Sequence, residues 1–244
     1  GRIPCASILW FSLRQPVKNG AFIKNNCFVF SQNGRLTKVA PVSATKLLGG
    51  HNQANILAAI CAARAYGVRW PAIRAAIRRF KGVPNRLEMI ECHPELVSGS
   101  RHLTFVNDCT ATSPEATIAA LKSFPAKKII LISGGNSKGS SLHELAKTIT
   151  ARARVLILMP GNANKELIKL IKSEQSNVIA SPDLPVGQAG AMSGQSNLAL
   201  VVLNSAKDFL PNVIPNEVRN LREAVKKACK CAAAGDIILF SPGL

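Results

Sequence analysis

The chain has 244 residues, enough for one large or two smaller domains with a substantial hydrophobic core. Hydrophobic residues make up 47% of it, which is typical of a globular protein and excludes a largely disordered chain. Its formal net charge of +18, from 31 Lys and Arg against 13 Asp and Glu, raises the question of an anionic partner.

The positive charges are spread along the predicted helices and do not gather in one basic segment. Nine Phe and one Tyr offer few rings for stacking on nucleic-acid bases. This distribution favours solvated helix faces over nucleic-acid binding, which stays open as the alternative. Anionic small substrates such as nucleotides fit the same sign of charge.

Targeting signals and cysteine usage both indicate a cytoplasmic protein. The longest apolar runs, residues 155–159 and 198–203, are far shorter than the roughly 18 residues of a membrane helix. No basic and apolar leader opens the chain, and it begins at Gly1 without Met, so we expect it to be part of a longer reading frame. Its seven cysteines form no C-x-x-C pair, which indicates reduced thiols and no metal site.

The first eighty residues predict β-structure followed by two helices. Asn25-Asn26 and Asn33-Gly34 are typical of tight turns between strands. Pro71 fits the first turn of a helix, where its missing N–H costs nothing. The predicted elements are a strand over residues 8–13, a hairpin over 21–23 and 27–30, and helices over 52–66 and 71–80.

After Val83-Pro84, strands and helices alternate. Strands are predicted over residues 87–91, 103–106, 128–132, 155–159 and 237–240, and helices over 113–124, 142–151, 164–172 and 221–233. Such repetition predicts an α/β fold with a doubly wound, mostly parallel sheet of the Rossmann type. In such sheets ligands collect beyond the carboxyl ends of the strands, where Asp108, Gly134 and Ser241 are expected.

Three segments rich in Pro, Gly, Ser, Gln and Asn interrupt this pattern, over residues 92–102, 181–197 and 211–220. We expect them to be peripheral insertions, with 92–102 and 181–197 cleaved first by proteases. Ordinary surface loops are the alternative.

The run from Asp108 to Pro114 is the first candidate site. A carboxylate just past a strand can accept the two hydroxyls of a ribose. The hydroxyl of Thr112, together with the N–H groups of the helix that begins near Ser113, can bind an anion. A plain helix-capping turn is the alternative.

The second candidate is the run from Ser133 to Gly139. Its glycines allow close backbone approach, and Lys138 could clamp a carboxylate or phosphate. The run is not a phosphate-binding P-loop, because no G-x-x-x-x-G-K-[ST] pattern is present. A solvated turn lysine is the alternative.

The third candidate is the pair Asn52 and Asn55, one helical turn apart. Both amides can face one ligand edge, and a carboxamide pairs a donor with an acceptor, which suits adenine. Helix capping by one Asn is the alternative.

These motifs resemble those of the Mur ligase family. GHNQAN at 50–55 with AA at 58–59 is similar to the family's G-x-H-N-x-x-N-x-x-A-A signature, and PNRLE at 84–88 to its H-R-F/L-E element. NDCTATSPEAT at 107–117 and GGNSK at 134–138 resemble elements of the D-glutamate-adding branch. GDIILFSPG at 235–243 matches the lead into the last family motif. The matches keep the family's order over nearly the whole chain.

The resemblance implies an ATP-dependent amide ligase of peptidoglycan precursor synthesis. ATP would phosphorylate the carboxylate of UDP-N-acetylmuramoyl-L-alanine, and the amine of D-glutamate would attack the acyl phosphate. By position, Asn52 and Asn55 would hold adenine, Arg86 and Asp108 the ribose and nucleotide, and Thr112 and Lys138 the carboxylates of D-glutamate. The resemblance also implies that residues 1–83 end a central ATP-binding domain and that residues 84–244 form the C-terminal domain, truncated at its end.

The chain also departs from the family pattern. The family's P-loop, Mg²⁺ ligands and uridine-binding domain would lie N-terminal to it, so we expect the chain to be inactive alone, and to work as a monomer when complete. Thr110 stands where many relatives have Lys, and Asn85 replaces a frequent His. A relative of folylpolyglutamate synthetase and a non-catalytic nucleotide- or nucleic-acid-binding module are the alternatives.

Overall fold

The computed structural model describes residues 8–90, 103–136, 139–179, 199–202 and 220–243. The chain divides into two compact units, Gly1–Gly82 and Val83–Leu244. Of the three predicted insertions, only Asn220 falls within the described residues. None of the helices in these ranges combines the length and the apolar composition required to cross a membrane.

The first unit contains a four-stranded sheet in the order β1-β2-β3-β4. Its strands are β1 (Trp10–Ser12), β2 (Gly20–Lys24), β3 (Cys27–Gln32) and β4 (Arg35–Pro41). β1 runs parallel to β2, and the other pairs are antiparallel. Both predicted turns are confirmed, since Asn25, Asn26 and Asn33 have φ of 49°, 55° and 50°, the left-handed backbone that two-residue hairpin loops require.

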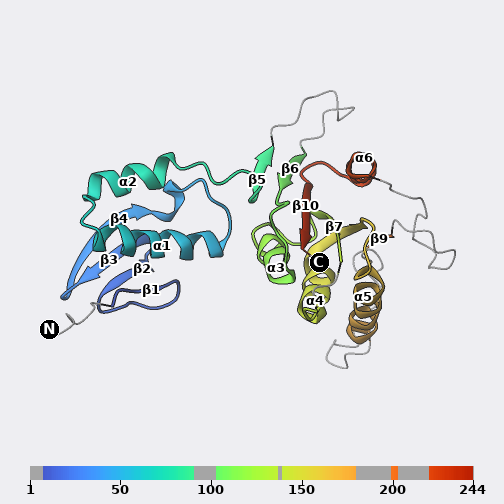
Figure 1. The fold of residues 1–244 in the computed structure, drawn as a ribbon, viewed down its shortest axis with the longest axis horizontal. Coiled ribbons are helices and arrows are strands. Elements are labelled where there is room, and N and C mark those ends of the chain that lie inside the picture. The colour runs from blue at the N-terminus through green and yellow to red at the C-terminus, as the bar shows by residue number, and fades with distance from the viewer. Residues whose placement is uncertain (1–7, 91–102, 137–138, 180–198, 203–219, 244) are drawn as a thin grey trace, which may run out of the picture. The chain divides into compact units, whose positions relative to one another are not determined.

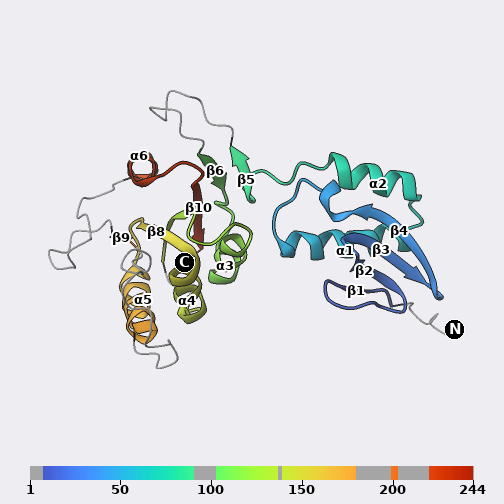
Figure 2. The same cartoon turned by 180° about the vertical axis from the view of Figure 1, so that it is seen from behind.

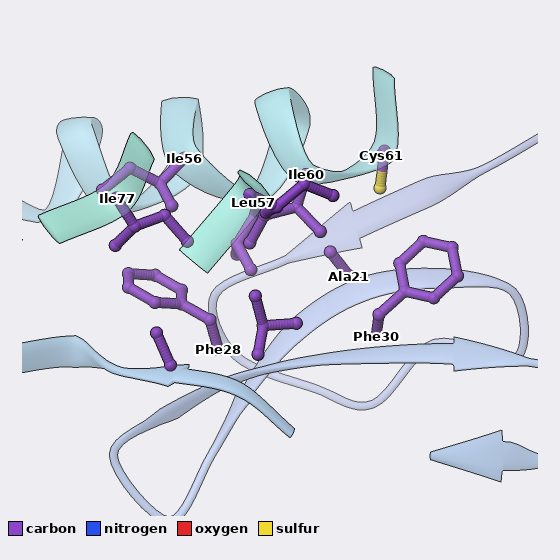
Figure 3. Close-up of a cluster of buried hydrophobic side chains, with 11 residues drawn as sticks. Ala21, Phe28, Phe30, Ile56, Leu57, Ile60, Cys61 and Ile77 are labelled. Carbon is purple, nitrogen blue, oxygen red and sulfur yellow. The ribbon is translucent and has the colours of Figure 1, made fainter. Parts of the chain in front are cut away.

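Two helices pack on this sheet. The short 3₁₀ helix η1 (Val42–Ala44) leads to α1 (Gly50–Ala65), which is followed by α2 (Trp70–Arg79). Figure 3 shows Phe28 of β3 beneath Leu57 and Ile60 of α1 and Ile77 of α2, all of them buried. The apolar positions of α1 recur at helical spacing, so one face of the helix meets the sheet.

The second unit contains a six-stranded sheet in the order β5-β6-β10-β7-β8-β9. Its strands are β5 (Glu88–Ile90), β6 (Thr104–Asn107), β7 (Ile129–Gly134), β8 (Ala153–Leu158), β9 (Ala199–Val202) and β10 (Ile237–Gly243). β5 is antiparallel to β6, and every other pair is parallel. The predicted α/β class with a mostly parallel sheet is therefore confirmed.

Helices cover both faces of this sheet, as in a doubly wound fold (Figures 1 and 2). They are α3 (Pro114–Lys122), α4 (His143–Arg152), α5 (Asn164–Ile179) and α6 (Leu221–Cys231). Ile130 and Ile132 of β7 pack in one cluster with Ala224 and Ala228 of α6. Successive side chains of a strand point to opposite faces of the sheet. Ile129 and Leu131 of β7 therefore line the other face, which α3, α4 and α5 cover.

The structure corrects the sequence prediction at three points. β9 was not predicted, and α5 continues to Ile179 instead of ending at Lys172. The first two candidate sites each follow a strand and predict neighbouring strand ends, but β10 lies between β6 and β7. Strand order is a non-local property, and local periodicity does not report it.

A partly buried ion pair joins β8 to the turn before β10. The Asp236 carboxylate is only 1% exposed and accepts bonds from the Arg154 guanidinium and from the Ala233 N–H, the latter at 2.7 Å. Arg154 also donates to the Cys231 carbonyl at 2.7 Å. This pair fixes the loop that delivers β10 into the middle of the sheet.

Asp236→Ala should therefore lower the free energy of unfolding by about 2 kcal/mol, since it leaves Arg154 without its counter-charge. The loss should be smaller than for a fully buried pair, because the Arg154 side chain is 35% exposed. Urea unfolding followed by circular dichroism measures it. The control Glu144→Ala, an exposed acid in the first turn of α4, should cost about 0.5 kcal/mol or less. Equal losses in the two variants would contradict the assignment.

Candidate functional site

Three parallel strands bring the candidate residues of the second unit to one edge of its sheet. Asn107 of β6 and Ile132 of β7 both pair with Phe240 of β10, so the carboxyl ends of the three strands lie together. Asp108 follows β6, and Ser241 lies near the end of β10. This is the edge at which ligands collect in sheets of this type.

Asp108 is 7% exposed, and its carboxylate is bonded to the protein on both oxygens. Oδ1 accepts from the Leu87 N–H at 3.1 Å, and Oδ2 from the Ser241 hydroxyl at 3.2 Å. Its own N–H donates to the Phe240 carbonyl at 2.8 Å. Asp108 therefore anchors the edge from within, and any contact with a ribose would come in addition to that role.

The segment that carries Arg86 has an unusual backbone. Asn85 and Leu87, on either side of Arg86, have φ of 64° and 44°, which L-residues adopt at a cost. The Asn85 N–H donates to Glu88 Oε2 at 2.8 Å, and the Arg86 N–H to the Val83 carbonyl at 3.2 Å. Arg86 itself is exposed. The segment thus presents one exposed guanidinium on a fixed backbone.

Two residues after Asp108, Thr110 turns back onto this segment. Its hydroxyl donates to the Asn85 carbonyl at 2.9 Å, and its N–H donates to the same oxygen at 3.3 Å. The Asn107 amide also donates to Asn85 Oδ1 at 2.8 Å. Cys109, between Asp108 and Thr110, is exposed and is a part of this site that sequence reasoning did not single out.

The start of α3 confirms the predicted cap. Ser113 has extended backbone angles, and its hydroxyl accepts from the Ala116 N–H at 3.4 Å. Two hydrogen bonds to the Glu115 carboxylate hold its pKa below the usual value. The larger effect comes from the backbone N–H of Glu115 itself, and the smaller from the Ser113 hydroxyl. Thr112 is exposed directly before this cap. The helix start therefore offers a hydroxyl beside N–H groups of positive partial charge.

The end of β7 makes a close approach to the end of β8. A Cβ at Gly134, whose φ is 148°, would lie 2.5 Å from the Met159 carbonyl oxygen. The Met159 N–H donates to the Ser133 carbonyl at 2.7 Å, and the Asn162 N–H to Asn136 Oδ1 at 3.2 Å. Lys138 lies outside the described residues, so its expected place beside Thr112 stays a prediction.

The asparagine pair lies at the start of α1 in the first unit. The Asn55 amide donates to Asn52 Oδ1 at 3.4 Å, and the Asn52 amide to the Leu48 carbonyl at 2.7 Å. The two side chains thus share one face, with Asn55 exposed. A cavity of about 410 Å³, lined by Phe11, Ser12, Leu13, Arg14, Gln15 and Ala54, opens next to this turn and was not predicted.

Within the described part of the chain, no group of three or more His, Cys, Asp and Glu side chains could hold a metal ion. The groups at the carboxyl edge are amides, hydroxyls, the exposed guanidinium of Arg86, the thiol of Cys109, and the carboxylates of Glu88, Asp108 and Glu115. The guanidinium, the hydroxyls and the start of α3 are suited to an anionic or hydroxyl-rich ligand.

A family model described as "Mur ligase, glutamate ligase domain" matches residues 94–244. The chain belongs to the Mur ligase family. The match covers β6, β7 and β10, the three strands whose ends build the edge described above.

Relatives in this family share the chain's length only in part. The UDP-N-acetylmuramoylalanine–D-glutamate ligase of Pelotomaculum thermopropionicum is 32% identical over 96% of this chain and 42% of its own length. The ligase of the same name from Lachnoclostridium phytofermentans is 28% identical over 99% of this chain and 43% of its own. The chain therefore spans less than half the length of these relatives.

Solved structures show the same fold. A pseudomurein peptide ligase type C from Methanothermus fervidus matches with a TM-score of 0.54 at 23% identity, over 93% of this chain and 39% of that one. A UDP-N-acetylmuramate–alanine ligase from Thermotoga maritima matches with a TM-score of 0.54 at 16% identity, over 96% and 44%.

In this Mur ligase chain, the two departures from the family pattern contact each other. The Thr110 hydroxyl donates to the main-chain carbonyl of Asn85, so this bond does not depend on the Asn85 side chain. It fastens the segment that carries Arg86 to the loop after β6.

The close approach at Gly134 predicts a large effect of a single methyl group. Gly134→Ala should lower the free energy of unfolding by roughly 2–5 kcal/mol, because the new Cβ would overlap the Met159 carbonyl in a backbone region unfavourable to L-residues. The matched control is Gly235→Ala, where φ is 77° but nothing lies within 4 Å. It should cost about 1 kcal/mol from backbone strain alone. Thermal unfolding of both variants gives the comparison, and equal losses would refute the close approach.

Proposed function

We propose that this chain is the C-terminal part of an ATP-dependent ligase that adds D-glutamate to UDP-N-acetylmuramoyl-L-alanine. The observation that carries the proposal is the run from Asp108 to Thr117, which links the end of β6 to the capped start of α3. The names of the relatives supply the substrates. They also favour this reaction over that of a folylpolyglutamate synthetase.

Under this proposal the first unit is the end of the ATP-binding domain and the second is the C-terminal domain. Asn52 and Asn55 hold the adenine, because their shared face presents carboxamide donors and acceptors. Arg86 and Asp108 hold the ribose and the nucleotide. Arg86 supplies an exposed positive charge, and the hydrogen bond from Leu87 to Asp108 fixes the backbone that carries it.

D-glutamate is assigned to Thr112 and Lys138. The exposed hydroxyl of Thr112 lies just before the N-terminus of α3, which favours a carboxylate. Lys138 follows the glycines at the end of β7, and we place its ammonium group against the second carboxylate. Two carboxylates on one substrate then meet one helix start and one cation.

The reaction transfers the γ-phosphoryl group of ATP to the alanine carboxylate, which gives an acyl phosphate and ADP. The D-glutamate amine then attacks the acyl carbon, the amide C–N bond forms, and phosphate leaves as the amine loses its proton. The residues of this chain contribute by holding the amine in line with the acyl carbon, and such positioning supplies much of the rate of a two-substrate reaction. We place the P-loop and the Mg²⁺ ligands outside these 244 residues.

We place the enzyme in the cytoplasm, a reducing compartment in which exposed thiols such as that of Cys109 persist. We propose a monomeric enzyme, and the net charge of +18 on these 244 residues suits anionic small substrates. Specific nucleic-acid binding and membrane association are not part of this proposal.

The proposal is tested in a complete enzyme, made by joining the N-terminal portion of the P. thermopropionicum ligase to this chain. Lys138→Ala should raise the KM for D-glutamate roughly tenfold to a hundredfold, because a charge-assisted bond is lost, and leave the KM for ATP nearly unchanged. The control Lys147→Ala, on an exposed position of α4, should change neither constant.

If Lys138→Ala raised the KM for ATP and left the KM for D-glutamate unchanged, Lys138 would be a nucleotide ligand and the assignment would be wrong. Phosphate release that does not depend on D-glutamate would contradict the proposed reaction. The 244-residue chain by itself should release no phosphate above a control without enzyme, because its sequence has no P-loop.

A further inference from the structure

Two buried hydroxyls stand behind the Asp108 carboxylate. Ser241 of β10 and Thr117 of α3 are both 0% exposed, and their oxygens lie 3.0 Å apart. Burying a hydroxyl costs free energy unless a hydrogen bond compensates, so an Ala or Val would be the cheaper choice at a position that only fills space. The two residues come from segments 124 positions apart in the sequence.

The hydrogen bonds of this group have one direction. An ionised carboxylate only accepts, so the Ser241 hydroxyl donates to Asp108 Oδ2, and the Thr117 hydroxyl donates in turn to Ser241. Asp108 Oδ1 then accepts from the Leu87 N–H. A continuous path of three bonds therefore runs from inside α3 to the backbone beside Arg86.

The far end of this path is the strained segment. Asn85 and Leu87 both have positive φ, and such backbone persists only where the surroundings over-determine it. Leu87 is itself buried, at 8% exposure, while Arg86 is exposed. The bond from Leu87 to Asp108 joins the strained backbone to a buried carboxylate, beside the bonds that Asn107 and Thr110 make to Asn85.

The end of β10 is pressed against α3 at the same place. The Gly243 N–H donates to the Ala111 carbonyl at 2.8 Å, and a Cβ at Gly243 would lie 1.8 Å from Thr117 Oγ1. The Ser133 hydroxyl donates to the Pro242 carbonyl at 3.2 Å. The main chain that follows Ser241 is therefore held in place beside α3 and β7.

We propose that Ser241 and Thr117 are positioning residues, whose hydroxyls hold the Asp108 carboxylate so that it fixes the Leu87 backbone and presents Arg86 to a nucleotide phosphate or ribose. The claim that Arg86 meets a nucleotide rests on the proposed function. The claim that the two hydroxyls fix the Leu87 backbone does not. The ligand would meet a segment that is already ordered, which reduces the entropy lost on binding.

The first test measures amide hydrogen exchange at Leu87 by NMR in the 244-residue chain without ligand. Ser241→Ala should speed exchange there roughly tenfold and Thr117→Val roughly threefold, because the carboxylate loses its direct or its indirect support. Thr117→Ser keeps the hydroxyl and should exchange like the parent chain. The control is Thr148→Val, a buried threonine of α4 whose hydroxyl bonds its own helix at the Glu144 carbonyl, and it should leave Leu87 unchanged.

Unchanged exchange at Leu87 in Ser241→Ala would overturn the proposal. A loss of protection spread over α3 and α4 would also overturn it. The same holds if Thr117→Val unfolds while Thr117→Ser stays folded, because the hydroxyl would then support the unit as a whole.

The second test measures the Kd of a fluorescent ATP analogue for the same variants, each joined to the N-terminal portion of the P. thermopropionicum ligase. Ser241→Ala should raise the Kd several-fold, and Thr117→Ser and Thr148→Val should not. If the joined parent enzyme does not bind the analogue while Leu87 exchange behaves as expected, the proposed function is wrong and the fixing of the Arg86 segment stands. If the joined parent enzyme binds and Ser241→Ala speeds exchange at Leu87 without changing the Kd, the positioning role is wrong.

Discussion

The second unit depends on one buried carboxylate. Asp108 is 7% exposed, and an unpaired charge at such a depth costs several kcal/mol. Bonds from Leu87 and Ser241 offset that cost, and they come from opposite ends of the unit's sequence. The start of the unit, the end of β6 and the end of β10 are thereby tied at one point. The geometry of the candidate site follows from that tie.

The parallel sheet determines what gathers around this point. Because β10 lies between β6 and β7, its last residues contact both the Asp108 loop and the glycine loop that leads to Lys138. The start of α3 and the exposed guanidinium of Arg86 lie at this edge, which supports the ligase reaction that we propose.

Local features of the fold could be predicted because they are encoded in a few adjacent residues. The Asn25-Asn26 and Asn33-Gly34 turns and the Ser113 cap depend on single side chains and backbone angles, and the structure confirms all three. The insertion of β10 between β6 and β7 could not be predicted, because strand order depends on contacts between distant residues. β9 was missed because it is short and follows a long segment without periodicity.

The candidate site shows the same division. Sequence motifs located Asp108 and Thr112, but they did not show that the Asp108 carboxylate is also bonded within the protein. That role could not be predicted, since it requires Leu87 and Ser241 to meet Asp108 in space. The bond from the Thr110 hydroxyl to the Asn85 carbonyl is likewise a contact that a sequence does not show.

The central claim is that the carboxyl edge of the second unit binds nucleotide. The exposed thiol of Cys109 lies in that edge, next to Asp108, and Cys229 on α6 serves as an internal reference in the same sample. The measurement, made on this chain joined to the N-terminal portion of the P. thermopropionicum ligase, is the rate of alkylation of each thiol by iodoacetamide, read on its own peptide by mass spectrometry, with and without saturating ATP. The account predicts that ATP slows alkylation of Cys109 several-fold and leaves Cys229 unchanged. If Cys109 were alkylated at the same rate with ATP and without it, the claim that this edge binds nucleotide would be contradicted.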